Sequence, residues 1–296
     1  MALAPLAKPP LPARLRGFLW VVPWTLFLGL TILVVNGIQT LSVLLLPVSR
    51  TAFRRLNRFL ANTWWGWCVT ASRLAHGFEL EITGDELPMR ESALVVVNHQ
   101  SMADVPMLMD LARRKDRLGD LKFFVKDELK WVPGMGLGMW FLDCIFVKRD
   151  WTRDRASVQA TFARVVDGKV PIWLVSFSEG TRLTPKKLAA SNAFAASRGL
   201  AATEHVMHPR PTGFAASVQG LRGHVDAVYD VTIGYVGGVP SLWQYALGYA
   251  PRAHLHVCRF GIGGLPDSDG ELATWLRDRF MVKDRRLAGF YASGAM

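Results

Sequence analysis

A long stretch without a single charged side chain, from Gly17 to Val48, constrains this chain more than any other feature of its sequence. Its only strongly polar breaks are Asn36 and Gln39. The stretch exceeds the roughly 20 residues that span a bilayer, and a core helix this long and apolar on every face would be unusual. A signal peptide would be shorter and end at small residues, whereas arginines follow here at once. The stretch therefore indicates attachment to a membrane.

The sequence leaves open how this segment sits in the membrane. Basic residues flank it on both sides, so the positive-inside rule gives no orientation: Lys8, Arg14 and Arg16 precede it, and Arg50, Arg54, Arg55 and Arg58 follow it. A helical hairpin or a re-entrant helix would bring both flanks to one surface, with the bend at Asn36-Gly37. A second helix-like stretch, residues 56–75, carries tryptophans that either lie at the membrane–water interface or pack against the first helix: Trp64, Trp65 and Trp67.

The formal net charge of +11 favours an anionic partner, either a nucleic acid or an anionic membrane. The apolar stretch favours the phospholipid membrane, because so apolar a segment does not suit a nucleic-acid-binding arm. No nucleic acid partner is expected. The scattered Cys68, Cys144 and Cys258 form no CxxC pair, which argues against a zinc site and against a disulfide framework. No metal is therefore expected, and so few cysteines are consistent with a domain that faces the cytoplasm.

Beyond His76 the periodicity changes, and strand-like runs alternate with helix-like ones. We predict strands at 78–82, 93–97, 121–125, 141–147, 170–177, 226–235 and 253–262, and helices at 101–113, 153–167 and 271–280. This alternation favours an α/β fold with a mixed, mostly parallel sheet flanked by helices. We expect a basic N-terminus with a helical membrane anchor over residues 1–76 and the α/β domain over residues 77–296.

The strand at 93–97 ends just before His99, and Asp104 follows five positions later. Imidazole ordinarily titrates near neutral pH, which suits a general base, and a carboxylate on its other ring nitrogen would fix the tautomer. Two groups on one face of a helix are three or four residues apart, not five. His99 is therefore expected on the loop and Asp104 in the first turn of the helix. Alternatively, Asp104 only caps the helix, because Ser101-Met102-Ala103-Asp104 resembles a capping box.

A second polar cluster, Glu179-Gly180-Thr181-Arg182, follows the strand at 170–177. Gly180 permits a tight turn, and Arg182 can bind a phosphate through two parallel hydrogen bonds. Thr181 offers a hydroxyl, while Glu179 could hold Arg182 or bind a substrate hydroxyl. The alternative for the cluster is a surface turn with a local ion pair.

Further cations follow two other predicted strands: Lys126 comes after 121–125, and Lys148-Arg149 after 141–147. In open α/β sheets, ligands bind beyond the carboxyl ends of the strands. We therefore expect these cations to surround His99, unless Lys148-Arg149-Asp150 is only a solvated run of charges.

The ordered set of motifs resembles the glycerolipid acyltransferase superfamily, above all the 1-acyl-glycerol-3-phosphate and lysophospholipid acyltransferases. The resemblance spans about residues 78–240 and rests on Asn98-His99-x4-Asp104, Phe146-Val147-x-Arg149 and Phe177-x-Glu179-Gly180-Thr181-Arg182. It implies that His99 deprotonates the acceptor hydroxyl and that Asp104 orients His99. The hydroxyl would attack the thioester of acyl-CoA or acyl-carrier protein, with no metal or other cofactor. The residues implied to bind the glycerol phosphate are Phe146, Arg149, Glu179, Gly180, Thr181 and Arg182.

The motifs also depart from the family pattern. Asp143 stands where the second block usually begins with glycine, and Ser178 stands where the third usually has proline. The fourth block, 208–213, resembles the branch that contains lysocardiolipin acyltransferases, which leaves the acceptor open.

We expect a membrane acyltransferase with its active site facing the cytoplasm, acting on a lysophospholipid, with 1-acyl-glycerol-3-phosphate favoured and phosphatidic acid as product. The alternatives are a different lysophospholipid acceptor, a catalytically silent lipid-binding or scaffold protein on this fold, and a hydrolase. The sequence has no Gly-x-Ser-x-Gly elbow to support a serine hydrolase.

Overall fold

The computed structural model describes residues 4–148, 150–250, 252–294 and 296. Strands in this part of the chain form one sheet in the order β1-β7-β6-β2-β5-β3-β4. All neighbouring strands are parallel except β6 and β7, which confirms the mixed, mostly parallel sheet. The strands are β1 (Glu79–Gly84), β2 (Ala93–Val97), β3 (Leu121–Lys126), β4 (Ile145–Val147), β5 (Trp173–Phe177), β6 (Ala227–Tyr235) and β7 (Arg252–Gly261).

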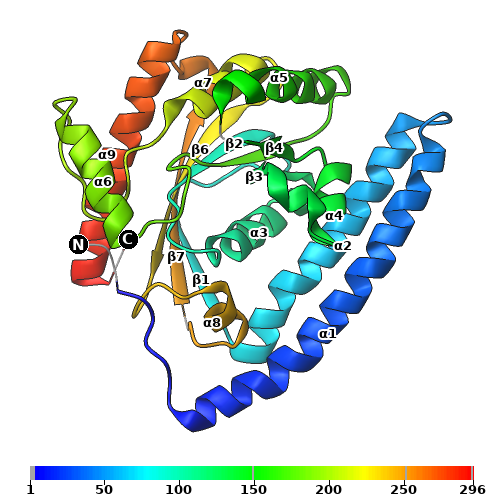
Figure 1. Cartoon of the computed structure of the whole chain (residues 1–296), viewed down its shortest axis with the longest axis horizontal. Helices are drawn as coiled ribbons and strands as arrows, with labels where there is room; N and C mark the ends of the chain where they lie inside the picture. The colour runs from blue at the N-terminus through cyan, green and yellow to red at the C-terminus, as the bar shows by residue number, and fades with distance from the viewer. Residues whose placement is uncertain (1–3, 149, 251, 295) are drawn as a thin grey trace.

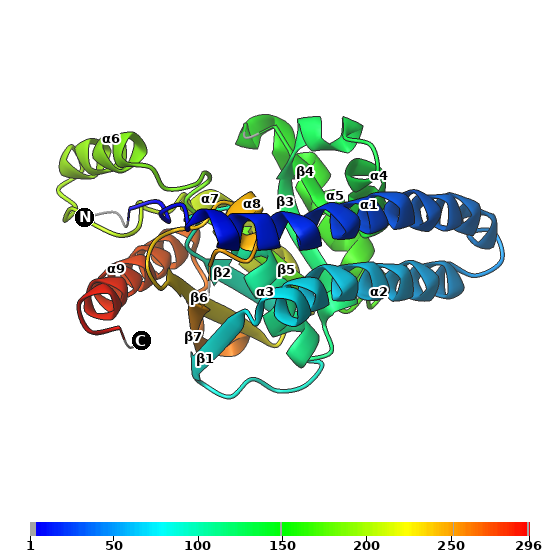
Figure 2. The same cartoon turned by 90° about the horizontal axis from the view of Figure 1, so that it is seen from below.

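Helices cover both faces of the sheet (Figures 1 and 2). Side chains from α2, α3 and α8 form the core on one face, and side chains from α5, α7 and α9 form the core on the other. The helices are α1 (Leu11–Ser42), α2 (Arg50–His76), α3 (Asp104–Arg114), α4 (Met135–Phe141), α5 (Trp151–Asp167), α6 (Pro185–Ala196), α7 (Pro211–Leu221), α8 (Leu242–Ala246) and α9 (Asp269–Ser293).

Strand β2 lies inside the sheet and is buried on both faces. Val95 and Val97 point into the core under α3, and Leu94 and Val96 point into the core under α5, α7 and α9. A strand covered on both sides reads as an unbroken apolar run. Because β6, β2, β5, β3 and β4 run in the same direction, the loops that follow them meet at one edge of the sheet, which we call the carboxyl edge.

The apolar stretch forms helix α1, which continues through Asn36 and Gly37. The chain reverses only at the short 3-10 helix η1 (Val43–Leu45), so a hairpin forms but the bend expected at Asn36-Gly37 is wrong. The side chains of Asn36 and Gln39 hydrogen-bond to each other and lie beside Gly138 of α4. These polar residues therefore mark a buried contact with α4 and leave the helix intact.

The hairpin keeps its basic flanks apart. Arg14 and Arg16 lie at the start of α1, and Arg50 begins α2 near the opposite end of α1, about 45 Å away at ~1.5 Å per residue. The hairpin therefore places the two basic flanks at opposite ends of α1. Arg54 points instead to the end of α5, where it donates to the carbonyl oxygens of Arg164 and Gly168.

Helices α1 and α2 lie side by side along the α/β domain in both ribbon views (Figures 1 and 2). Trp64 donates to the carbonyl oxygen of Leu28, Trp67 packs on Phe27 of α1, and Trp65 packs on Phe123 of the sheet. Trp64 and Trp67 thus pack against the first helix, as the second alternative predicted, whereas Trp65 packs against the sheet. Within the described residues, one helical segment, Leu11–Leu45, is long and apolar enough to cross a membrane by length and composition. Only 11% of its most apolar window is buried, unlike a core helix.

Several predicted boundaries are wrong. Residues 135–141 form α4, and β4 begins only at Ile145, because the helix that starts after Pro133-Gly134 includes Phe141. Strand β5 begins at Trp173, just after Pro171, which has no N–H to donate to the sheet. Helix α9 continues to Ser293, well beyond residue 280. The sequence analysis missed α6, α7 and α8.

Candidate active site

The end of β2 is fixed before the loop that carries His99 begins. Asn98 is fully buried, and its side chain makes two hydrogen bonds with the backbone of Ile233 on β6. Its Nδ2 donates to the Ile233 carbonyl oxygen at 3.0 Å, and its Oδ1 accepts from the Ile233 N–H at 2.8 Å. His99 therefore leaves the sheet from a rigid base.

The structure pairs His99 with Asp104, as the sequence predicted. Nδ1 of His99 lies 2.8 Å from Oδ2 of Asp104, and the Asp104 side chain is completely buried. The same oxygen accepts the backbone N–H groups of Gln100 and Ser101. A carboxylate here favours a proton on Nδ1, which leaves Nε2 as the basic nitrogen. Asp104, the first residue of α3, thus both orients His99 and fixes the loop.

Tyr235, at the end of β6, completes the surroundings of Asp104. Its hydroxyl donates to Oδ1 of Asp104 at 2.6 Å. Burial raises the pKa of the Tyr235 phenol well above its ordinary value, so the hydroxyl remains a donor. The sequence analysis missed Tyr235, although its position at the carboxyl end of a predicted strand was an available signal.

The loop after β5 packs directly against His99. The Phe177 ring stacks on the His99 ring with centroids 3.9 Å apart. Glu179 is buried and accepts the N–H of His99 at 2.9 Å and that of Met207 at 3.3 Å. Burial raises the pKa of Glu179 to about 8, against the opposing effect of these two N–H groups. Glu179 therefore has backbone partners in place of the ion pair with Arg182 that we considered from the sequence.

The rest of this loop turns at Gly180, which has a φ of +73°. Beyond the turn, the N–H of Leu183 donates to the carbonyl oxygen of His99 at 2.8 Å, so the two loops are joined. Thr181 accepts a hydrogen bond from Lys187 at 2.6 Å. The Arg182 side chain is exposed at the same edge.

The remaining predicted residues lie farther along the carboxyl edge. Lys126 is the exposed last residue of β3, and half-buried Phe146 in β4 packs against the core on the α3 face. The strand order places β3 about 10 Å and β4 about 14 Å from β2, at ~4.8 Å per strand. Arg149 lies outside the described residues. The structure therefore joins His99, Asp104 and the 177–183 loop by direct contacts and leaves Lys126 and Phe146 at a distance.

Helix α9 contacts three parts of this edge. The buried Lys283 amine forms an ion pair with Asp230 and donates to the carbonyl oxygen of Val231 at 2.5 Å. Asp284 accepts backbone N–H groups in the segment 204–206. Tyr291 hydrogen-bonds to Gln100, the residue after His99. The sequence analysis missed all three residues of α9.

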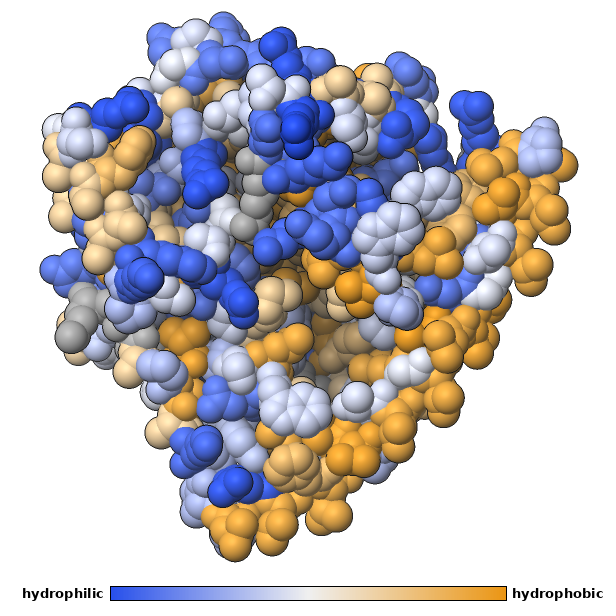
Figure 3. All heavy atoms as spheres, in the orientation of Figure 1, coloured by the Kyte–Doolittle hydropathy of each residue, from blue (hydrophilic) through white to orange (hydrophobic). Residues whose placement is uncertain are grey.

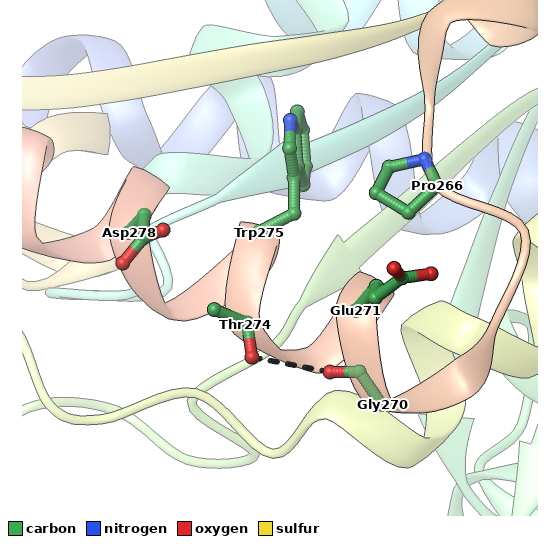
Figure 4. Close-up of a pocket in the computed structure, with 6 residues that line it drawn as sticks. All are labelled: Pro266, Gly270, Glu271, Thr274, Trp275 and Asp278. Carbon is green, nitrogen blue, oxygen red and sulfur yellow. Dashed lines mark hydrogen bonds between the residues drawn. The ribbon is translucent and has the colours of Figure 1, made fainter.

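A surface hollow of about 350 Å³ lies at the start of α9 (Figure 4). It follows β7, whose end pairs with the first residues of β6, so it lies at the edge opposite to His99. Its lining contains none of the predicted site residues: Pro266, Gly270, Glu271, Thr274, Trp275 and Asp278.

Comparisons with known proteins identify the family of this chain. The family model "Acyltransferase" matches residues 79–236, and the model "Acyltransferase C-terminus" matches residues 247–296. The chain is 34% identical to 1-acyl-sn-glycerol-3-phosphate acyltransferase 2 of Arabidopsis thaliana, covering 90% of this chain and 70% of that protein. It is 34% identical to lysocardiolipin acyltransferase 1 of Danio rerio, covering 83% of this chain and 65% of that protein.

A solved structure has the same fold: the 1-acyl-sn-glycerophosphate acyltransferase PlsC from Thermotoga maritima. It superposes with a TM-score of 0.58 at 17% identity, covering 96% of this chain and all of that one. The chain therefore belongs to the acyltransferase family. Within that family it lies among the lysophospholipid acyltransferases, which confirms the resemblance found in the sequence. Helix α1 and these relatives together indicate membrane association.

Proposed function

We propose that this protein transfers a fatty acyl chain from acyl-CoA or acyl-carrier protein to the free hydroxyl of 1-acyl-glycerol-3-phosphate, giving phosphatidic acid. The contact between His99 Nδ1 and Asp104 at 2.8 Å carries this proposal. Nε2 of His99 takes the hydroxyl proton while the hydroxyl oxygen attacks the thioester carbonyl carbon. The tetrahedral adduct collapses, the carbon–sulfur bond breaks, and the leaving thiolate takes the proton from His99. Asp104 stabilises the imidazolium between these steps.

The acceptor assignment rests on the cation in the loop that is joined to His99. Arg182 is exposed, and its guanidinium has no hydrogen bond or ion pair with any described residue. A guanidinium can bind a phosphate through two parallel hydrogen bonds. One observation favours a second acceptor class, a larger lysophospholipid such as lysocardiolipin: the fourth block, 208–213, resembles that branch, and a lysocardiolipin acyltransferase is among the relatives.

Acyl transfer by the purified protein in detergent tests the proposal, with labelled acyl-CoA and a panel of lysophospholipids. We expect an ester product with 1-acyl-glycerol-3-phosphate as the best acceptor. If no product forms, the assay is repeated with acyl-carrier protein as the donor. Thioester hydrolysis without ester formation would identify a hydrolase, and no reaction with either donor would favour a silent lipid-binding protein.

We also infer how α1 sits in the membrane. It lies in the membrane–water interface, and the side turned away from the α/β domain, its outer face, is in the hydrocarbon region. Exposed apolar side chains run along this face: Leu15, Leu19, Leu26, Leu30, Leu33 and Leu41. The orange surface in Figure 3 follows the hairpin, and a hollow with apolar walls opens between the hairpin and the rest of this face. Gly17 contacts Leu247, and Ile32 contacts Gly134, so the domain covers the inner side of α1 along its length. A helix that contacts the domain on one side and exposes apolar side chains on the other can lie along the membrane surface, with the exposed side in the hydrocarbon region.

The hollow would receive the acyl chains, and the active site would face the cytoplasm, from which the soluble thioester arrives. Three exposed tryptophans beside the hairpin support an interfacial depth, since indole rings favour the headgroup region: Trp131, Trp140 and Trp243.

Placing charges on the outer face of α1 tests this arrangement. The double variant Leu26→Glu, Leu30→Glu should bind anionic vesicles about 100-fold more weakly per charge, because a carboxylate at hydrocarbon depth is costly. Vesicle flotation measures the bound fraction. Met89→Glu is the control, because Met89 is similarly exposed but lies before β2, at the edge opposite to the site. Unchanged binding of the double variant would place this face outside the membrane.

A further inference from the structure

Arg210 lies against the loop that follows β5, although it belongs to the segment between α6 and α7. Its N–H donates to the carbonyl oxygen of Ser178 at 2.7 Å. A Cβ on Gly180 would lie 3.1 Å from Cδ and 3.2 Å from Nε of Arg210. The Arg210 side chain therefore lies directly on the bare backbone of Gly180, next to the residue that holds His99.

The backbone that carries Arg210 is fixed from several sides. Asp284 of α9 accepts the N–H of His205 at 2.6 Å. Glu179 accepts the N–H of Met207, and Ser191 of α6 accepts the N–H of His208 at 3.0 Å. A segment held by three different elements positions its next side chain reproducibly.

The guanidinium of Arg210 has no protein partner of its own. Its side chain is exposed and makes no hydrogen bond or ion pair with any described residue. Two arginines elsewhere in the molecule differ: Arg279 pairs with Asp230, and Arg222 donates to backbone carbonyl oxygens. The neighbouring carboxyl, Glu179, is buried and directed to backbone N–H groups. Arg210 and Arg182 therefore both contribute positive charge at this loop, and Glu179 does not form an ion pair with either of them.

We propose that Arg210 binds a substrate phosphate group together with Arg182. This inference rests on the proposed function, and it adds a residue outside the three motifs that carried that function. Arg210 lies on Gly180, and Arg182 follows Gly180 by two residues in the same loop. Two guanidinium groups carried by one loop can share the oxygens of one phosphate, since each offers parallel N–H donors. Both the acceptor and acyl-CoA carry phosphates, so the experiment must separate these two sources.

Kinetics of the full-length Arg210→Gln variant in detergent provide the test. If the acceptor supplies the phosphate, the KM for 1-acyl-glycerol-3-phosphate should rise about 10- to 100-fold while the KM for acyl-CoA stays unchanged. A monoacylglycerol acceptor, which lacks the phosphate, should then react equally with both proteins. If the donor supplies it, the KM for acyl-CoA should rise instead, and acyl-pantetheine should remove the difference. Unchanged KM values for both substrates would overturn the proposal.

Two further variants make the result specific. Arg90→Gln removes the same charge from an exposed ion pair before β2, at the opposite edge, and should leave both KM values unchanged. The double variant Arg210→Gln, Arg182→Gln tests whether both residues bind one phosphate. In that case the rise in KM of the double variant should differ from the product of the rises in the two single variants. A rise in KM equal to the product of the two single rises would count against a shared phosphate.

Direct binding separates this inference from the proposed function. The rise in Tm caused by 1-acyl-glycerol-3-phosphate, or by adenosine 3′,5′-bisphosphate for the donor, can be measured without turnover. A smaller rise for Arg210→Gln would support phosphate binding even if wild-type protein transferred no acyl chain. An equal rise for both proteins with both ligands would contradict it. The Tm without ligand should stay unchanged, because the side chain is exposed.

Discussion

Replacing His99 by alanine should lower kcat for acyl transfer about a thousandfold or more, while the protein stays folded and bound to membranes. General base catalysis typically contributes 10²- to 10⁴-fold, and Nε2 of His99 is the basic nitrogen in this site. The substitution should leave the loop in place, because Glu179 and Leu183 bond to the backbone of His99 and not to its ring. Initial rates with labelled acyl-CoA measure the loss.

His224→Ala is the matched control for this experiment. The His224 ring contacts the carbonyl oxygen of Val170, before β5 and β6 begin, and so lies away from the carboxyl edge. We expect nearly full activity in this variant. If His99→Ala kept more than a tenth of the wild-type kcat, the assignment of His99 as the base would be wrong.

The second large effect is expected for Asp104→Asn, with kcat lower by about a hundred- to a thousandfold. An asparagine cannot hold the charge that stabilises the imidazolium, and its amide can favour the wrong tautomer of His99. This variant should also unfold more easily. Asp104 accepts hydrogen bonds from His99, from two backbone N–H groups and from Tyr235, and an NH₂ group would face some of these donors.

Tyr235→Phe separates the two consequences of changing Asp104. It removes one donor from Oδ1 and leaves the carboxylate and its bond to His99 in place. We expect a stability loss of about 1–3 kcal/mol, the usual cost of an unpaired buried acceptor, and a much smaller fall in kcat than for Asp104→Asn. Thermal unfolding and initial rates on the same samples provide both quantities. If Asp104→Asn lowered Tm but not kcat, Asp104 would only cap α3.

The sequence predicted best where the relevant contacts are local. The limits of β2 agree with the prediction, because a strand buried on both faces is an apolar run that ends where polar Asn98 begins. His99 and Asp104 lie five residues apart, and their meeting depends only on one loop and one helical turn. The loop at 178–182 follows a strand adjacent to β2, so its position near His99 was also accessible.

The residues that the sequence missed reach the site through long-range packing. Tyr235 and Arg210 come from separate elements and meet the catalytic loops only after the sheet is assembled. Lys283 interrupts the apolar pattern of α9, yet it is buried there because Asp230 provides a partner. Asn36 suggested a bend for the same reason: a polar side chain buried against a neighbour and one at a helix break look alike in a sequence.

The contacts of α9 set an order in which the molecule becomes competent during its synthesis. Residues 11–76, which form the hairpin, leave the ribosome before the sheet, and Lys283, Asp284 and Tyr291 leave after its last strand. Until they arrive, Val231, the segment 204–206 and Gln100 lack the partners that α9 gives them. A nascent chain can therefore reach the bilayer through α1 and α2 before the carboxyl edge is complete, so delivery to the membrane can precede the onset of chemistry.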